Sequence, residues 1–586
     1  MSSNSRFIPS ENGTGLPTIQ FKVGGTDLTN QVPLLAVSVI HQANRISKAQ
    51  IVLRDGDPAA EDFEFSNQNV FAPGEEVEIL MGYHNNEEPV FKGIVIRQGI
   101  EFSNESEPIL VVECRHEAIR MTVGRKNAAY DEDSTDSDVI ETIIGRNKGL
   151  SADVEATSAT QKEMIQYYVS DWDFIVTRAE MNSMLVFTEE GNKVVVKKPD
   201  SSSSPSLCLT FGDTLYSFQA HMDARYQYPK VRSISWDYAD QAIIEEEGDD
   251  PGIQEQGNLS SSTLSDVIGL DEYHQMHSGQ VVDQELKAWS EATMFRSRLA
   301  KVKGTARIQG FNLRPGETVE MQGVGDRFNG NVLITGVRHE FNANNWESEL
   351  EFGLSRNWQH EAFDDYQEAD ASGLVPGIPG LQIAKVVQLE EDPDGENRIL
   401  VKVPVIEDDA NGIWARVATL DAGDGRGSFF LPEVDDEVVL GFLNGDPRDP
   451  IVLGMLHSSA KPAPLDASDD NHEKGFVTRS EMKLLFNDDT KVITIETPGG
   501  NKITISDEDK GMKLEDQNGN FIELGSDGIT IESAKDVNIK ATGDVNIEGM
   551  NISESAQVQY KAEGTAGAEI SSSATMVVKG SLVQIN

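Results

Sequence analysis

Ile493-Thr494-Ile495-Glu496 begins a series of short strand motifs that fills the last part of this chain. Each motif alternates apolar and polar residues, which is the period of a strand with one buried face. The series continues with Ile503-Thr504-Ile505-Ser506, Met512-Lys513-Leu514-Glu515, Ile529-Thr530-Ile531-Glu532, Val537-Asn538-Ile539-Lys540 and Val545-Asn546-Ile547-Glu548. Gly- and Asp-rich corners separate the motifs. Because one such strand cannot bury its apolar face, the repeats predict a stacked β-helix or β-prism rather than a compact enzyme domain.

Length and charge limit the class of protein. The chain has 586 residues, which is too long for one hydrophobic core and predicts about two to four domains. It carries 98 acidic and 49 basic residues, a formal net charge of −49. This balance argues against a nucleic-acid-binding protein, because such proteins use an excess of Lys and Arg to neutralise phosphates.

The cysteines and the N-terminus give an expectation for localisation. Cys114 and Cys208 lie far apart and form no CxxC motif, so we expect two reduced thiols, with no role assigned to either. Residues 1–10 are polar and lack the apolar core of a signal peptide, and no apolar run approaches the roughly 20 residues of a membrane helix. We therefore expect synthesis in the cytoplasm, with export by a route that reads no N-terminal signal.

Local patterns divide the remainder into strands and a few helices. Strand-like runs fill about 17–120 and return after about 304. Capping residues and helical spacing predict helices at about 137–146, with an Asp or Ser cap, at about 171–180, and at about 282–303 with basic residues in its last turns. The Glu- and Ser-rich stretch at 239–280 is interpreted as a long acidic surface loop.

The most specific pattern lies in residues 381–457. Its elements, in order, are Arg398-Ile399-Leu400-Val401-Lys402-Val403-Pro404, Trp414-Ala415-Arg416-Val417, Phe430-Leu431-Pro432-Glu433-Val434 and Gly445-Asp446-Pro447-Arg448-Asp449-Pro450. This order resembles the OB-fold domain of the VgrG family, the spike proteins of type VI secretion and related contractile injection systems. One departure is Asp435, where the family usually has glycine. Upstream, 170–174 and 304–352 are similar to the family's hub, which is like that of phage baseplates.

The resemblance implies a mainly β architecture. It would comprise β-rich hub domains with a few helices, an OB-fold β-barrel, and a C-terminal needle formed as an intertwined triple-stranded β-helix, or β-prism. The expected segments are a baseplate-hub-like region at 1–362, a linker at 363–380, the OB-fold domain at 381–460, a tether at 461–480 and the needle at 481–586.

The resemblance also implies a homotrimer. In a three-chain prism, each face would stack strands from successive chains at about 4.8 Å, so about a dozen repeats would extend on the order of 55 Å. Thr494, Thr504, Asn538 and Asn546 would then point outward. The expected trimer core consists of Ile493, Ile495, Ile503, Ile505, Ile529, Ile531, Val537, Ile539, Val545 and Ile547. The alternative is a single-chain solenoid.

No pattern predicts catalytic, cofactor or metal chemistry. His116-Glu117 and His339-Glu340 begin like a zinc-protease motif but lack its second His. The acidic cluster at 131–138 lacks the central Gly of a calcium loop, and the Gly-rich 423–427 leads into a strand rather than a helix. Residues 458–480 leave no room for the lysozyme domain of some phage spikes. We therefore expect a protein that is not an enzyme and binds no cofactor.

The C-terminus suggests a docking site for a tip protein. The needle has no His after His472, so the metal-binding histidines that seal some phage tips are missing. The resemblance implies a separate PAAR-like cap, because the last strand edges would otherwise stay unpaired. The expected docking residues are Met576, Val577, Val578, Leu582, Val583 and Ile585.

Together with these patterns, the resemblance implies a structural spike that joins an inner tube and baseplate to a membrane-puncturing needle. Expected partners are further copies of the chain, tube and baseplate proteins at the hub, the tip protein and effector cargo, with only transient contact with a target membrane. A spike with cell-wall hydrolase activity and a trimeric adhesin or tail fibre are the alternatives. The pattern does not distinguish a type VI spike from an extracellular injection particle or a phage tail, nor name the cargo or target.

Overall fold

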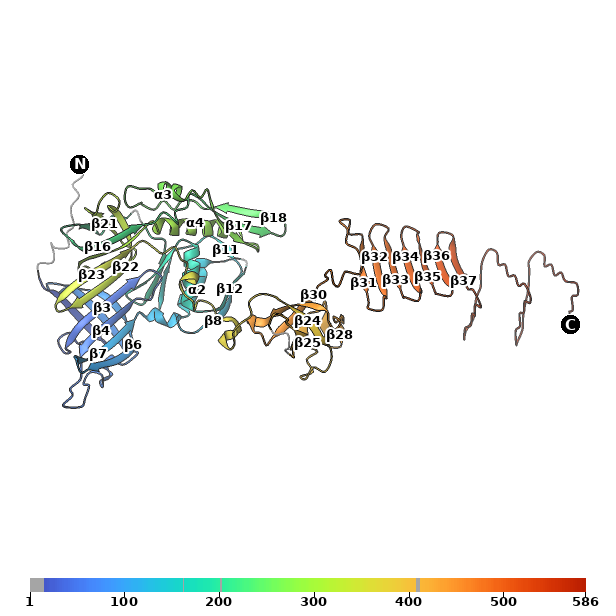
Figure 1. Cartoon of the computed structure of the whole chain (residues 1–586), viewed down its shortest axis with the longest axis horizontal. Helices are drawn as coiled ribbons and strands as arrows, with labels where there is room; N and C mark the ends of the chain where they lie inside the picture. The colour runs from blue at the N-terminus through green and yellow to red at the C-terminus, as the bar shows by residue number, and fades with distance from the viewer. Residues whose placement is uncertain (1–14, 162, 201–202, 407–410, 586) are drawn as a thin grey trace. The chain divides into compact units, whose positions relative to one another are not determined.

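The computed structural model describes residues 15–161, 163–200, 203–406 and 411–585 (Figure 1). The chain forms two compact units, one holding residues 1–382 with most of the barrel described below, the other holding the remaining barrel segments and 454–586. Most elements are strands, as expected from the sequence. The domain boundaries stay predictions, and the start of the expected hub at residues 1–14 lies outside the described residues. Within the described chain, no helix has the length and apolar character needed to cross a membrane.

A 13-stranded sheet forms the framework of the hub, here defined as residues 15–362. Its order is β16-β20-β23-β22-β3-β4-β7-β6-β5-β1-β2, with β21 joining β22 and β15 joining β21. Strands far apart in sequence meet where β3 pairs antiparallel with β22, with Val39 opposite His339. The strands are β1 Pro17–Val23, β2 Thr26–Asp27, β3 Leu34–Gln42, β4 Lys48–Arg54, β5 Glu76–Tyr83, β6 Asn86–Ser103, β7 Ser106–Arg115, β15 Leu207–Thr210, β16 Leu215–Met222, β20 Val302–Gln309, β21 Thr318–Gln322, β22 Gly330–Asn342 and β23 Asn345–Phe352.

The predicted helices are confirmed, with small shifts at their ends. Helix α1 spans Asp136–Gly145 and is capped by Thr135, whose side chain and that of Asp138 form a capping box, rather than by the expected Asp or Ser. Helix α2 spans Asp171–Met181 with Ser170 as its cap. Helix α4 spans Asp283–Leu299. Smaller elements around them are β8 Lys126–Tyr130, β9 Ser134–Thr135, β10 Ser151–Val154, β11 Thr160–Gln161, β12 Met164–Val169, β13 Leu185–Glu189, β14 Lys193–Lys197 and α5 Gln359–Ala362.

The prediction of an acidic loop at 239–280 is wrong. This stretch holds β18 (Ala242–Glu247), α3 (Ser261–Ile268) and β19 (Tyr273–His277), and both strands pair with β17 (Val231–Asp237). The Glu run is held in a strand because Arg232 of β17 forms ion pairs with Glu245 and Glu247, and also with Glu272. The positive charge of Arg232 on the neighbouring strand therefore offsets the mutual repulsion of the glutamates, which had favoured the prediction of a solvated loop.

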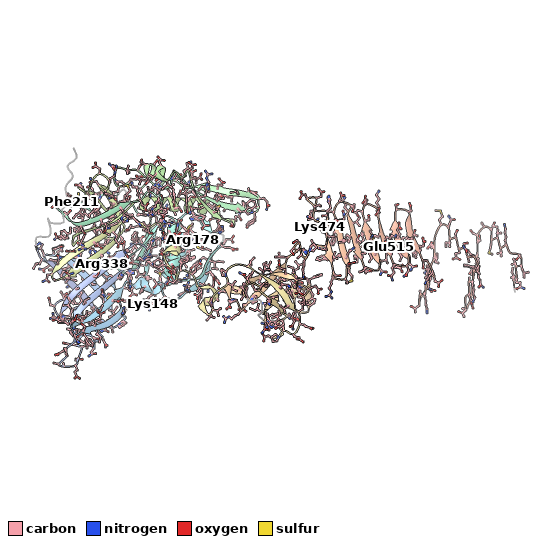
Figure 2. The ribbon with its side chains drawn as sticks, viewed as in Figure 1. Lys148, Arg178, Phe211, Arg338, Lys474 and Glu515 are labelled. Carbon is pink, nitrogen blue, oxygen red and sulfur yellow. The ribbon has the colours of Figure 1, made fainter. Side chains whose placement is uncertain are left out.

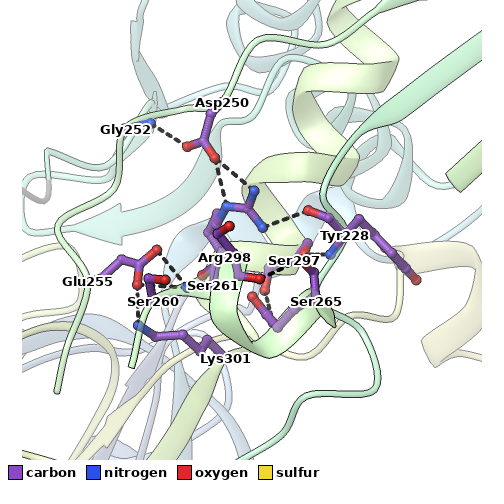
Figure 3. A network of polar contacts seen from close by, with 12 residues as sticks. Tyr228, Asp250, Gly252, Glu255, Ser260, Ser261, Ser265, Ser297, Arg298 and Lys301 are labelled. Atoms are coloured by element: carbon purple, nitrogen blue, oxygen red, sulfur yellow. Dashed lines mark hydrogen bonds and ion pairs between the residues drawn. The ribbon is translucent and has the colours of Figure 1, made fainter. Parts of the chain in front are cut away.

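The basic end of α4 anchors the segment between β18 and α3 (Figure 3). The Arg298 guanidinium donates to the Asp250 carboxylate at 2.8 and 2.9 Å. Lys301 donates to Glu255 at 2.7 Å, and that carboxylate also accepts from the Ser261 backbone N–H at the start of α3. The basic residues expected to complement the helix dipole thus also make specific ion pairs with the acidic segment.

A closed barrel follows the hub, with the order β24-β25-β26-β30-β29. Inward-facing Val386, Val401, Ala415, Leu440 and Val452 are buried. The Gly-rich 423–427 forms a hairpin and no helix start, with Ala422 opposite Gly427. The strands are β24 Gln382–Gln388, β25 Ile399–Lys402, β26 Ile413–Val417, β27 Ala422–Gly423, β28 Arg426–Gly427, β29 Glu437–Phe442 and β30 Pro450–Met455.

Asp435, which replaces a glycine of the resembled family, has a φ of 71°. This left-handed backbone is strained for most residues but accessible to Gly and, at some cost, to Asp. The departure noted in the sequence therefore stands at a position whose backbone conformation suits glycine.

The C-terminal repeats form a seven-stranded antiparallel sheet in which each strand pairs with the next along the chain (Figure 1). The prediction that neighbouring strands come from successive chains is wrong for these seven. Short turns rich in Asp, Asn and Gly, such as 497–501 and 516–520, reverse the chain at a low entropic cost of loop closure. Each strand therefore lies beside its predecessor. The strands are β31 Glu473–Val477, β32 Lys483–Asn487, β33 Val492–Glu496, β34 Lys502–Ser506, β35 Gly511–Glu515, β36 Phe521–Gly525 and β37 Gly528–Glu532.

The last two motifs behave differently. Val537–Lys540 and Val545–Glu548 form no strand in the described chain, although the sequence pattern predicts strands there. A strand exists only with a hydrogen-bonded neighbour, and beyond β37 the described chain provides none.

Candidate assembly interface

One face of the seven-stranded sheet is a continuous apolar surface, here called the apolar face. Cross-strand register places its side chains in two rows. Twelve of the thirteen are exposed, from 36% at Ile493 to 70% at Ile529. The first row is Phe476, Leu484, Ile495, Ile503, Leu514, Ile522 and Ile531; the second is Phe486, Ile493, Ile505, Met512, Leu524 and Ile529. A contiguous apolar surface of this kind marks a site of association.

The opposite face of the sheet is mostly polar. Its central row runs through Thr494, Thr504, Lys513, Glu523 and Thr530. Thr494 and Thr504 therefore lie opposite the isoleucines of their strands, as their alternation predicts. Because the thirteen side chains of the apolar face lie on the same side of the sheet, a single copy of the sheet leaves that face in water.

Charges along one border of the sheet favour this register. Lys483 of β32 is opposite Glu496, which is opposite Lys502, which is opposite Glu515 (the last is labelled in Figure 2). Opposite charges directly across strands stabilise a pairing by about 0.2–1 kcal/mol each. A slip by one residue would break this ladder and move every isoleucine to the polar face.

The structure brings only part of the predicted trimer core together. Ile493, Ile495, Ile503, Ile505, Ile529 and Ile531 share the apolar face, whereas Val537, Ile539, Val545 and Ile547 lie beyond β37 in no sheet. The predicted tip residues, from Met576 to Ile585, are also outside any strand, and their exposed fractions range from 48% to 91%.

Sequence reasoning left out seven members of the apolar face: Phe476, Leu484, Phe486, Met512, Leu514, Ile522 and Leu524. Met512 and Leu514 stand in one of the quoted motifs. Leu484 and Phe486, like Ile522 and Leu524, show the same alternation, so the period-two signal alone would have found them.

The histidines of the two zinc-protease-like dipeptides are structural. His116 is buried, accepts from the Ala118 N–H through Nδ1, and contacts the Glu189 carbonyl through Nε2. His339 is buried beside His41, with ring centroids 6.3 Å apart, and contacts Ser348. Burial lowers the pKa of His116 to about 4 and that of His339 to about 3, so both are neutral at pH 7.

A buried ion pair joins three parts of the hub. Arg296 of α4 pairs with Glu180 of α2, and the same carboxylate accepts from Asn44 Nδ2 at 3.0 Å. Arg296 also donates to the carbonyls of Ser355 and Asn357. Burial raises the pKa of Glu180 and, in the opposite direction, lowers that of Arg296. Because every group in this cluster is hydrogen-bonded, the pair positions α2 and α4 at a defined distance.

Comparisons with known proteins agree with this architecture. A family model for the Alg8 N-terminal domain matches residues 13–343, more than half of the 586 residues. A model for the type VI secretion system/phage-baseplate injector OB domain matches 382–457, and one for the phage baseplate V C-terminal trimerisation domain matches 492–586. The type VI secretion system spike protein VgrG4b of Pseudomonas aeruginosa is 35% identical over 101 residues. The chain belongs to the Alg8 N-terminal domain family. Its later segments are similar to the injector OB domain, the baseplate trimerisation domain and VgrG spike proteins.

The matches to curated spike proteins are local. The VgrG4b match covers 16% of this chain and 11% of the relative. VgrG3 of Vibrio cholerae is 34% identical over 113 residues, which is 18% of this chain and 11% of that protein. Among solved structures, the tail protein from Neisseria meningitidis MC58 has a TM-score of 0.43 and 14% identity, and covers 59% of this chain and 99% of that one.

Proposed function

We propose that the protein is the homotrimeric structural spike of a contractile injection apparatus. The observation that carries this proposal is the apolar face, which one chain leaves exposed. Three sheets related by a threefold axis would bring their apolar faces together as the three walls of a prism. The trimerisation-domain match over 492–586 supports the same arrangement.

The energy available from this closure is large. Burying the exposed half of each side chain would contribute about 1 kcal/mol. Over the thirteen residues of the apolar face this amounts to roughly 10 kcal/mol per chain before the entropic cost of association. Such a prism has hydrogen-bonded backbone along its length, which suits a rod that transmits force.

The proposed mechanism is mechanical. Contraction would drive an inner tube whose front is closed by the trimeric hub, and the prism would concentrate the force on a small area of a target envelope. Beyond β37 the three chains would wind around each other, which would give Val537, Ile539, Val545 and Ile547 the partners they lack in one chain.

Further partners follow from this role. We propose tube and baseplate proteins at the hub, effector cargo, and a PAAR-like tip protein on the exposed apolar residues from Met576 to Ile585. The spike would be delivered outward with the apparatus and contact the target membrane only in passage. It would act without enzymatic activity or a cofactor.

The test is the solution mass of the purified chain by light scattering after size exclusion. We expect three times the 64.2 kDa of one chain. Ile503→Asp, on the apolar face, should reduce the mass to that of a monomer or produce aggregates. Thr504→Asp places the same charge on the opposite face of the same strand and should leave the trimer intact. A monomeric wild-type protein at micromolar concentration would contradict the proposal.

A further inference from the structure

A groove of about 810 Å³ crosses one side of the hub. One wall comes from β12 and α2, the other from β19 and the start of α4, and α5 contributes the remainder. Its lining is rich in large apolar side chains, among them Ile165, Met276, Trp289 and Trp358. Met276 is 78% exposed and Ile165 60%, which is unusual for side chains of this kind on a folded domain.

Both walls include a strand with a free edge. β19 lies at the border of the sheet ordered β18-β17-β19, and among the described strands β12 pairs with β8 alone. The groove is lined by Met164 and Ile165 of β12 and by no residue of β8. A free strand edge presents backbone N–H and C=O groups that can pair with another chain.

The register shows which backbone groups of β19 are available. β19 runs parallel to β17, and the Tyr273 N–H donates to the Lys230 carbonyl at 3.0 Å. Because backbone groups alternate in direction along a strand, those of Gln275 and His277 also face β17. The N–H and C=O groups of His274 and Met276 therefore point away from β17, at the free edge of β19.

The charges of the lining favour a cationic occupant. Three carboxylates line the groove, those of Glu163, Glu285 and Glu361, against one guanidinium. That guanidinium, Arg178, is already paired with Asp136 and Glu285 (Figure 2 labels Arg178). A second copy of this chain, with 98 acidic against 49 basic residues, offers poor charge complementarity.

We propose that this groove binds an extended segment of another protein, with alternating apolar and basic residues, as a strand added to the edge of β19 or β12. Backbone hydrogen bonds would give affinity, apolar side chains would pack on Met276 and Ile165, and Lys or Arg would face the carboxylates. The inference does not rest on the proposed spike function, because it concerns the hub alone.

The probe is a six-residue peptide, the length of β12, with alternating lysine and valine and blocked ends. Binding to the full-length protein is followed by the fluorescence of Trp289 and Trp358. A second peptide of the same sequence carries N-methyl groups on alternate backbone nitrogens, which removes hydrogen-bond donors and keeps the charge. We expect the N-methylated peptide to bind at least about tenfold more weakly, about 1.4 kcal/mol.

Met276→Lys tests the site, and Ile243→Lys is its matched control. Ile243 is an exposed apolar residue on β18, at the opposite edge of the same sheet, so both variants add one charge at an exposed position. We expect Met276→Lys to weaken peptide binding about tenfold relative to Ile243→Lys. Equal effects of the two variants, or equal binding of both peptides, would overturn the proposal. A change in native mass with Met276→Lys alone would also overturn it, because a second copy would then occupy the groove.

Discussion

Acid should destabilise the hub through three buried histidines. Burial, and next the positive charge of Arg314, lowers the pKa of His41 to about 4. Burial lowers the pKa of His116 to about 4 and that of His339 to about 3. Their ordinary pKa is 6.5, so the unfolded chain binds protons at a higher pH than the folded hub does. This contribution to stability is complete above pH 6.5 and is lost as the pH falls toward 4.

The magnitude follows from these values. At pH 5 an unfolded histidine is almost fully protonated and a folded one with a pKa of about 4 is mostly neutral, which favours unfolding by about 2 kcal/mol. Three such groups give about 6 kcal/mol between pH 7 and pH 5, comparable to the whole stability of many domains. We expect a steep loss of hub stability in this interval.

The variant that isolates one group is His41→Gln. In the wild type, His41 Nε2 donates to the Val90 carbonyl at 2.7 Å, and Nδ1 accepts from Ser47. A glutamine amide offers one donor and one acceptor but cannot titrate. The difference in unfolding free energy between pH 7 and pH 5 should therefore fall by about 2 kcal/mol in this variant.

The assay is urea unfolding of the full chain at fixed protein concentration, followed by tryptophan fluorescence at each pH. His221→Gln, at an exposed position on β16 of the same sheet, is the control and should keep the wild-type pH dependence. Identical pH dependence in His41→Gln and the wild type would refute the reasoning.

Two further predictions concern single sites. Arg296→Met should destabilise the hub by about 3–5 kcal/mol because it leaves the Glu180 carboxylate buried and unpaired. Combining Arg296→Met with Glu180→Leu should recover most of that loss. Additive effects of the two substitutions on the free energy of urea unfolding would contradict this expectation. Asp435→Ala should destabilise the barrel by about 1 kcal/mol because alanine disfavours a φ of 71°. Asp435→Gly should melt close to the wild type, and equal melting temperatures of the Ala and Gly variants would exclude backbone strain as the cause.

Local signals predicted α1, α2 and α4 well but missed α3. The cap Ser170 marks the start of α2, and basic residues mark the end of α4. Both signals lie within a few adjacent residues, because a cap or an end charge acts within one turn of its helix. The barrel was predicted by a resemblance, and Asp435, the departure from that resemblance, has a left-handed backbone that suits glycine.

Long-range contacts account for the error in 239–280. The sequence around Glu245 suggested a side chain in water, but Glu245 forms an ion pair with Arg232 across the β17–β18 pair. The same arginine forms an ion pair with Glu272, 40 residues away in sequence. The groove of the hub was also invisible to sequence reasoning. Its lining residues run from Glu163 to Glu361 with no shared motif, because two separate sheets and three helices bring them together.

The sequence by itself determined which side chains of the repeats share a face, since successive side chains of a strand point to opposite sides wherever the strand lies. Only the tertiary structure decided which strands are neighbours. Short turns favour pairing within the chain from β31 to β37, and beyond β37 the described chain offers no neighbouring strand. The direction of a side chain is a property of the local backbone, whereas pairing depends on which strands meet in space, and the alternation of apolar and polar residues does not encode that.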